Sequence, residues 1–265
     1  MGTSPIDREW MSVASHSVGR RGMVKRHAPS VRTPLQTRIN LLDGFQLWHG
    51  STTLATPLTV QKVLAFLALQ GRTVSRGYAA GVLWPATTEE HAAASLRSAL
   101  WKSRQSGLQL TESTRVDLGL TKSVVVDVRE MLAVVERTTH DNKGGDPRDD
   151  DLLCLTGDLL PGWYEDWVVM ERERLRLLRL HALESLSRCL IADRVFDRAV
   201  LAALAAVTTE PLRESANRIL IEAYLAEGNV AEAILRYLKY GSLLMKELGV
   251  QPSFRLSELT GGAGP

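Results

Sequence analysis

The sequence predicts a protein of mixed class, in which a small α+β region is followed by a region that is almost entirely helical. Three observations indicate this division. Strand-like and helical patterns alternate between residues 38 and 128. From residue 151 onward, apolar residues recur at helical spacing almost throughout. Within that part, Ala192–Ala199 aligns with Ala226–Ala233 at an offset of 34 residues, which is the period of tetratricopeptide helix pairs.

The chain opens with a polar segment over residues 1–37, which is predicted to be a disordered arm because it lacks a sustained hydrophobic period. It has no apolar stretch long enough for the core of a signal peptide. A tail without contacts is the more common case, but nonspecific DNA affinity could come from Arg20, Arg21, Lys25 and Arg26.

A small sheet and two helices are predicted next. The strands are expected at Arg38–Leu42, Phe45–Trp48 and Thr52–Leu58, with glycine-containing turns between them. The first helix is expected over Gln61–Gln70, and Gly71 stands where a C-terminal cap glycine belongs. The second helix begins after Ser75, a candidate N-cap, and ends at Trp84-Pro85.

A third helix is predicted over Glu90–Ser106 and can be divided by the helical angle of about 100° per residue. The face expected to pack on the core consists of Ala92, Ala93, Leu96, Ala99, Leu100 and Ser103. The outward face and its flanks carry His91, Ala94, Arg97, Ser98, Trp101, Lys102, Arg104 and Gln105. The acidic residues Glu89 and Glu90 are confined to the helix start, where negative charge suits the helix dipole.

A helix of this kind can read DNA, because small polar side chains enter the major groove while flanking arginine and lysine residues hold phosphates. A solvated amphipathic helix would show the same pattern by itself, so the neighbouring elements carry the argument. The residues expected to contact DNA from this helix are Arg97, Ser98, Trp101, Lys102, Arg104 and Gln105.

Strand-like runs follow the third helix, at Leu108–Leu110, Val116–Leu120 and Val124–Asp127, with turns expected at Glu112–Thr114 and Gly119–Ser123. A hairpin there would place Thr121, Lys122 and Ser123 at the tip of a wing, although Lys122 could equally be a solvated turn residue. Contacts to the DNA backbone are expected from Lys62, Arg76 and Lys122. Two helices followed by a hairpin have the order of a winged helix-turn-helix.

Several segments resemble the Streptomyces antibiotic regulatory protein (SARP) family. In the first half they are Leu58–Leu69, Val74–Arg76, Leu83–Pro85 and Ser95–Trp101. In the second half they are Pro161–Trp167, Glu171–Leu175, Glu210–Glu214 and Glu247–Pro252. The likeness extends from about Thr37 to Leu259.

The resemblance implies an OmpR-like winged-helix DNA-binding domain at residues 38–128, a bacterial transcriptional activation domain with tetratricopeptide-like helices at 129–259, and a tail at 260–265. It implies an activator that binds direct repeats in promoter DNA and recruits RNA polymerase holoenzyme. The controlled genes are expected to serve antibiotic or other secondary-metabolite biosynthesis. A head-to-tail dimer on the DNA is also expected.

Three positions depart from the family pattern. Lys102 and Arg104 occupy the place of an Arg-x-Arg pair, and lysine lacks the planar fork that pairs with guanine, so we expect Lys102 to contact phosphate. Ser103 stands where leucine is usual, and Gly77 stands where helix-favouring or acidic residues are more common. The target sequence can therefore differ from that of relatives.

The net charge is +2, which is too small by itself to indicate a nucleic-acid partner. Its distribution is uneven, because residues 1–128 carry 15 basic and 8 acidic residues, whereas residues 129–265 carry 17 basic and 22 acidic residues. This asymmetry fits a contact with double-stranded DNA in the first half and a protein contact in the second.

Catalytic motifs are missing from the sequence. We find no phosphate-binding loop, nucleophile elbow or zinc-protease helix, so we expect neither enzyme activity nor a cofactor. The acidic segment Thr139–Asp151 lacks the ligand spacing of a calcium loop, so no metal site is expected, and it is either a linker or a loop within the second domain. Cys154 and Cys189 are expected to be buried thiols in the cytoplasm, with the protein at the nucleoid. No segment has membrane-spanning length.

The helical region has further expected features. Helices are predicted over Arg129–Arg137 and Trp167–Cys189. In the second of these, ion pairs on the helix surface are favoured over contacts to DNA or to the first domain for Glu171, Arg172, Glu173, Arg174, Arg176 and Arg179. The residues expected to anchor the core are Trp163, Tyr164 and Trp167.

Two alternatives remain open. One is a tetratricopeptide-type adaptor whose winged helix has become a protein-docking surface, because Trp101 is large for a DNA-reading face. The other is a repressor, since the residues do not give the sign of regulation.

Overall fold

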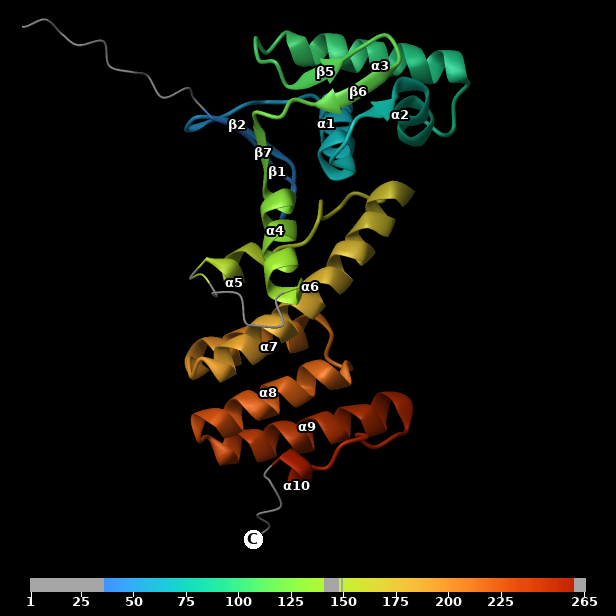
Figure 1. Cartoon of the computed structure of the whole chain (residues 1–265). Coiled ribbons are helices and arrows are strands. Elements are labelled where there is room, and N and C mark those ends of the chain that lie inside the picture. The colour runs from blue at the N-terminus through green and yellow to red at the C-terminus, as the bar shows by residue number, and fades with distance from the viewer. Residues whose placement is uncertain (1–35, 141–147, 149, 260–265) are drawn as a thin grey trace, which may run out of the picture. The chain divides into compact units, whose positions relative to one another are not determined.

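Two small sheets form the framework of the first region (Figure 1). The structure, a computed structural model, describes residues 36–140, 148 and 150–259. The first sheet has the order β3-β2-β1-β7, built from Thr52–Thr53, Gln46–His49, Thr37–Asn40 and Val124–Val126. The second has the order β4-β6-β5, built from Val74–Ser75, Asp117–Leu120 and Thr111–Ser113. All pairs are antiparallel except β1 with β7.

Three helices belong to the same region: α1 (Leu58–Gln70), α2 (Arg76–Leu83) and α3 (Glu89–Arg104). Gly71 ends α1 with φ 65°, a left-handed conformation that glycine adopts without a steric penalty. The Ser75 side chain accepts a hydrogen bond from the backbone N–H of Tyr78 at 3.2 Å, so Ser75 is the N-cap of α2. Both predictions are confirmed.

The predicted third strand is wrong beyond Thr53. Leu58 is the first residue of α1, and Pro57 is its N-cap. Proline has no backbone N–H to donate to a neighbouring strand, so a strand through Pro57 would lose a ladder bond. The bounds of the third helix also differ, because it begins at Glu89 and ends at Arg104.

Asp127 connects the first sheet to α4 (Asp127–His140). Its carboxylate accepts backbone N–H bonds from Leu41 at 2.8 Å, from Leu42 at 2.9 Å and from Val128 at 2.7 Å. The end of β1 is thereby fixed to the start of α4, which contains the predicted helix Arg129–Arg137 and extends it at both ends.

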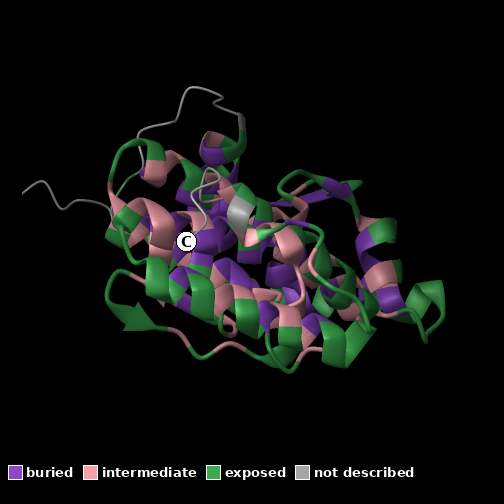
Figure 2. Ribbon diagram, turned by 90° about the horizontal axis from the view of Figure 1, so that it is seen from below, coloured by how far each residue is buried: buried purple, intermediate pink, exposed green. Residues whose placement is uncertain are grey.

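The second region is helical, as predicted, and consists of α5 (Asp151–Cys154), α6 (Asp166–Ala192), α7 (Phe196–Thr209), α8 (Glu214–Glu227), α9 (Val230–Leu248) and α10 (Leu256–Leu259). From α6 to α9, each helix packs on the next (Figure 1). Figure 2 shows that buried residues gather in the interior between the ribbons and that exposed residues lie at the periphery.

The offset of 34 residues is visible in the backbone. Arg194 and Gly228 both adopt a positive φ, of 61° and 91°, in the turns between α6 and α7 and between α8 and α9. Ala199 and Ala233, one turn into the following helices, are both 0% exposed. Small side chains there let paired helices approach closely, so the repeat is a pair of equivalent helical hairpins.

The two regions are in direct contact, and the described residues from 36 onward belong to one compact unit. Leu42 and Leu159 form an isolated β-bridge, and the backbone N–H of Asp43 donates to the carbonyl of Asp158 at 2.7 Å. A loop of the helical region thus extends the end of β1. The domain boundary between residues 128 and 129 stays a prediction.

The three aromatic residues predicted to anchor the core differ in how far they are buried. Trp163 and Trp167 are partly buried with their rings at right angles, and Trp167 also meets Phe66 of α1 edge-on at 5.6 Å between ring centroids. Tyr164 is 82% exposed, so the prediction was wrong for this residue. It lies in the segment before α6, between Trp163 and Glu165, which are both only partly exposed.

Residues 1–35 of the predicted arm, most of the loop Thr139–Asp151 and the tail at 260–265 lie outside the described residues. The prediction of a disordered arm is wrong at Thr37, which is the first residue of β1. Among the residues that the structure describes, no helix is both long and apolar enough to cross a membrane.

Candidate nucleic-acid interface

Helix α3 is fixed by its cap and by its inner face. The Thr88 side chain, the N-cap, accepts a hydrogen bond from the backbone N–H of His91 at 3.4 Å, while Glu89 and Glu90 occupy the first turn. The buried residues are Ala92, Leu96, Ala99, Leu100 and Ser103, as the angular division predicts, whereas Ala93 is only half-buried. The orientation of the outward face is therefore set by core packing.

Every residue predicted to read DNA from α3 is exposed: Arg97, Ser98, Trp101, Lys102, Arg104 and Gln105. Trp101 is 62% exposed, which is unusual for so large an apolar side chain. Within the described part of the chain, the side chains of Arg97, Lys102 and Arg104 have no hydrogen-bond or ion-pair partner. Their charges face solvent and are available to an external anion.

The hairpin next to α3 consists of β5 and β6, and its tip is the turn Thr114–Val116. The predicted tip at Thr121, Lys122 and Ser123 is wrong. Those residues connect β6 to β7, and β7 leaves the hairpin to pair with β1 in the other sheet. Lys122 is exposed, but the hairpin places it at the opposite end from the tip.

Gly119 is the first residue of the predicted turn Gly119–Ser123, and this part of the prediction is wrong. It lies instead in β6, opposite Glu112 of β5. A Cβ atom at this position would approach the Cγ2 atom of Thr73 to 2.9 Å, so glycine is needed for the close approach of Thr73. The predicted turn at Glu112–Thr114 is likewise occupied in part by β5.

Arg115 is the functional candidate that the sequence analysis missed. It is exposed at the hairpin tip, between Thr114 and Val116. The Thr114 side chain accepts hydrogen bonds from the backbone N–H groups of Val116 at 3.2 Å and Asp117 at 2.9 Å, which fixes the turn. The sequence pattern that indicates this residue is a threonine followed by an arginine between two strand-like runs, which is typical of a turn with an exposed arginine.

The two remaining predicted phosphate contacts are engaged within the protein. Lys62 of α1 forms an ion pair with Glu165 at 2.5 Å, and both side chains are largely buried. Arg76 of α2 donates a hydrogen bond from Nη1 to the Ser113 side chain at 2.6 Å. Their charges are therefore less available to DNA than those of α3.

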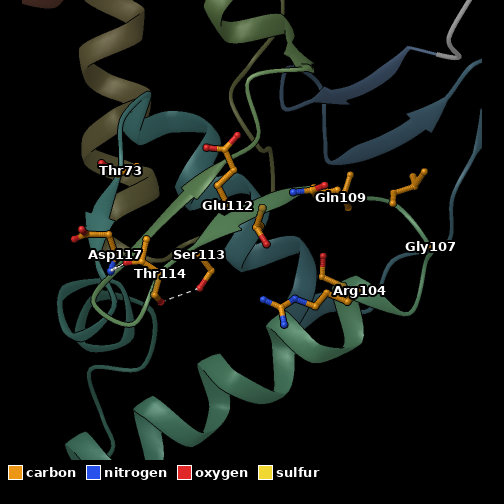
Figure 3. A pocket seen from close by; sticks show the side chains of 12 residues that line it. Thr73, Arg104, Gly107, Gln109, Glu112, Ser113, Thr114 and Asp117 are labelled. Carbon is orange, nitrogen blue, oxygen red and sulfur yellow. Dashed lines mark hydrogen bonds between the residues drawn. The ribbon is translucent and has the colours of Figure 1, made fainter.

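A cleft of about 620 Å³ lies between the end of α3 and the hairpin (Figure 3). Arg104 lines it from α3, and Ser113, Thr114 and Asp117 line it from the hairpin. Among the described residues that line it, Arg104, Glu112 and Asp117 carry a full charge. The two carboxylates restrict where a polyanion can approach, so contact is expected along the outer face of α3 and at Arg115.

The described residues give little support for metal binding or for cysteine chemistry. No group of three or more histidine, cysteine or acidic side chains there could hold a metal ion. Cys154 and Cys189 are free and half-buried, so the prediction of buried thiols is only partly correct. Burial raises the pKa of both thiols, which disfavours the reactive thiolate.

The arginines of α6 behave differently from those of α3. Arg174 pairs with Glu171 at 2.5 Å and Arg176 pairs with Glu173 at 2.8 Å, as predicted. Arg172 is an exception, since it donates to the backbone carbonyls of Leu159 at 2.9 Å, Leu160 at 2.8 Å and Trp163 at 3.0 Å. Arg179 similarly donates to the carbonyl of Gly157 and lies 3.7 Å from Asp158. These two arginines hold the loop before α6.

The sequence and the fold match known regulators. The family model of the bacterial transcriptional activator domain matches residues 126–261. The chain is 28% identical over 265 residues to regulatory protein AfsR of Streptomyces griseus, covering 89% of this chain and 26% of that protein. It is also 28% identical over 239 residues to regulatory protein AfsR of Streptomyces coelicolor, covering 84% and 24% respectively. The chain spans about a quarter of the length of these curated relatives.

Among solved structures, Mycobacterium tuberculosis EmbR in complex with a low affinity phosphopeptide has the same fold, with a TM-score of 0.64 and 19% identity over 86% of this chain and 64% of that chain. The family model covers more than half of this chain, and its members are transcriptional regulators rather than a class of enzymes. The chain therefore belongs to the bacterial transcriptional activator domain family and is a transcriptional regulator of the SARP type.

Proposed function

We propose that this protein is a sequence-specific activator that places α3 in the major groove of promoter DNA and brings RNA polymerase holoenzyme to that promoter. One observation supports it above the others. Arg97, Lys102 and Arg104 are exposed and unpaired within the described residues, on a helix whose opposite face is buried. Cations held outward by a fixed helix suit phosphates and guanine edges.

The residues divide into two roles in this proposal. Arg104 and Arg97, with Ser98 and Gln105, read base edges or hold adjacent phosphates, while Lys102 contacts phosphate because lysine has no bidentate fork. Arg115 at the hairpin tip replaces Lys122 as the wing residue that approaches the minor groove. Lys62 leaves the set of DNA contacts because Glu165 holds it.

The operator is proposed to be a direct repeat, with its half-sites about one helical turn, or roughly 34–36 Å, apart. Two molecules would then bind head to tail, and α6 to α9 would present the surface that meets polymerase. Antibiotic or other secondary-metabolite genes are the proposed targets, on the strength of the likeness to SARP regulators. The nucleoid would be the place of action.

The test begins with capture of genomic fragments by the purified protein, followed by gel shifts on the enriched sites at several salt concentrations. We expect short direct repeats and an affinity that falls about 100-fold between 50 and 200 mM salt, if about four phosphates are contacted. The double variant K102A/R104A should lose this binding and should keep the wild-type free energy of unfolding. Binding without sequence preference would contradict the proposal. A reporter gene behind the operator then distinguishes an activator from a repressor.

A protein-docking adaptor is the second candidate, and one observation favours it. Trp101 stands at the edge of a pocket of about 480 Å³, whose apolar wall includes Leu47, Leu54, Pro57 and Val60. Exposed tryptophan beside an apolar pocket is common at protein interfaces. An adaptor would lose its protein partner after W101A and keep it after R104A, because Arg104 does not line this pocket. An activator would lose promoter occupancy after K102A/R104A.

A further inference from the structure

Arg76 is bonded to both arms of the β5–β6 hairpin, close to its tip. It follows β4 directly and is the first residue of α2. Its backbone N–H donates to the carbonyl of Val116 at 2.8 Å, on the β6 side of the turn. Its Nη1 donates to the Ser113 side chain at 2.6 Å, on the β5 side. Since β6 lies between β4 and β5, the guanidinium reaches across the central strand of the sheet.

The hairpin needs such an anchor because it is short. β5 has three residues, β6 has four and β4 has two, so the ladder offers few hydrogen bonds to orient the tip. Isolated hairpins of this size are marginally stable in water. The bonds of Thr114 set the conformation of the turn, but they are local and do not fix the turn relative to α3.

The environment of Arg76 differs from that of the cations on α3. Arg76 is half-buried and its guanidinium is already committed to Ser113, whereas Arg97, Lys102 and Arg104 are exposed and have no partner within the described residues. A rigid guanidinium fork suits a fixed internal bond of this kind. The geometry therefore favours a structural task for Arg76 over the phosphate contact that the sequence predicts.

We propose that Arg76 is a positioning residue that holds the wing, through Ser113, at the orientation in which Arg115 meets DNA. This inference rests on the proposed DNA-binding function, and it assigns Arg76 and Ser113 as a pair that sets the wing contact. The pair would contribute to affinity without touching the nucleic acid.

A double-mutant cycle on the captured operator tests the pair. We expect R76A and S113A each to weaken binding about three- to tenfold, and the double variant to be no weaker than either single variant. The conservative change S113T keeps the hydroxyl group and should bind like the wild type. Each weakening variant should also remove protection of the minor groove beside the wing, while protection by α3 in the major groove persists.

A phosphate contact by Arg76 predicts another pattern and would overturn the proposal. S113A would then bind like the wild type, R76A would weaken binding, R76K would restore most of it, and R76A would reduce the slope of affinity against salt by about one. Circular dichroism melting of each variant shows whether a loss of binding comes from a loss of the fold.

Amide hydrogen exchange without DNA separates this inference from the proposed function. If Arg76 positions the wing, R76A and S113A should both speed exchange of the Thr114 and Asp117 amides by about tenfold, and S113T should not. Unchanged exchange in R76A would refute the positioning role. If the wild type fails to select an operator while exchange responds as described, the proposed function fails and the Arg76–Ser113 anchor stands.

Discussion

Helices α3 and α6 are both rich in cations, yet they use them in opposite ways. On α3, Arg97, Lys102 and Arg104 have no partner within the described residues. On α6, Arg174 and Arg176 each pair with a glutamate three residues earlier. The difference follows from the position of the acids, because those of α3 are confined to its first turn, more than two turns from Lys102.

This comparison shows that the number of basic residues does not identify a DNA-binding helix. The partners of each cation decide its role, since a paired arginine stabilises the fold and an unpaired one can bind an external anion. Arg172 and Arg179 extend the point, because they use their donors on backbone carbonyls of the preceding loop. Substitutions of the bonded residues on α6 are therefore expected to lower the free energy of unfolding.

The largest effect is expected from Glu184, a buried carboxylate of α6. It is 4% exposed and accepts hydrogen bonds from Arg213 at 2.6 Å and Ser215 at 2.7 Å. E184A leaves the Arg213 charge without its partner, so the free energy of unfolding should fall by about 3–5 kcal/mol. Urea denaturation measures this loss. A change below about 1 kcal/mol would show that solvent replaces the carboxylate.

The same residue gives the unfolding free energy a pH dependence. Burial of Glu184 acts to raise its pKa, but the bonds from Arg213 and Ser215 outweigh burial and hold the pKa below its ordinary value. The stabilisation is thus complete above the unfolded pKa of about 4.3, and it is lost as pH falls through the folded pKa. The isosteric variant E184Q should lack this component of acid sensitivity, which urea titrations at several pH values would measure.

Arg172 should produce the next largest effect. R172A removes three hydrogen bonds to the carbonyls of Leu159, Leu160 and Trp163, and the free energy of unfolding should fall by about 3 kcal/mol. DNA affinity of the folded variant should stay within about twofold of the wild type, because Arg172 is bonded inside the protein. A loss of affinity without a loss of stability would place Arg172 at the DNA and break the comparison of the two helices.

On α3, Arg104 and Lys102 should separate base reading from phosphate binding. R104A should weaken operator binding by about 1–3 kcal/mol and relax the preference at one or two base pairs. K102A should weaken binding to all sequences alike and reduce the salt slope by about one. Both variants should unfold within about 0.5 kcal/mol of the wild type, because the side chains are exposed. Selection of randomised sites by each variant measures the preference.

Features that depend on neighbouring residues or on a regular spacing could be predicted from the sequence. Angular reading placed Leu96 and Ser103 inside and Lys102 outside, because a regular helix converts spacing directly into direction. The cap at Gly71 and the repeat at 34 residues were also predictable, since each depends on a few neighbouring residues or on a fixed period.

Long-range pairing was the part that sequence reasoning missed. Strand β7 leaves the hairpin because Val126 pairs with Ile39, 87 residues earlier in the chain, and no local pattern reveals that partner. Glycine is common in turns, yet Gly119 lies within β6, where Thr73 occupies the space that a Cβ atom would need. Arg115 was missed for the same reason, since the wing tip could be located only after β5 and β6 were paired.

Arg174 should give the smallest effect and so provides the control for both helices. Within the part of the chain that the structure describes, its guanidinium pairs with Glu171 alone, and half of its side chain is exposed, so water replaces most of what the ion pair supplies. R174A should change the free energy of unfolding by less than about 0.5 kcal/mol and should leave operator affinity unchanged. A stability loss approaching that of R172A would mean that surface pairs on α6 matter as much as bonds to the loop. A loss of affinity would instead mean that a paired arginine can still serve DNA, and pairing would then no longer distinguish α6 from α3.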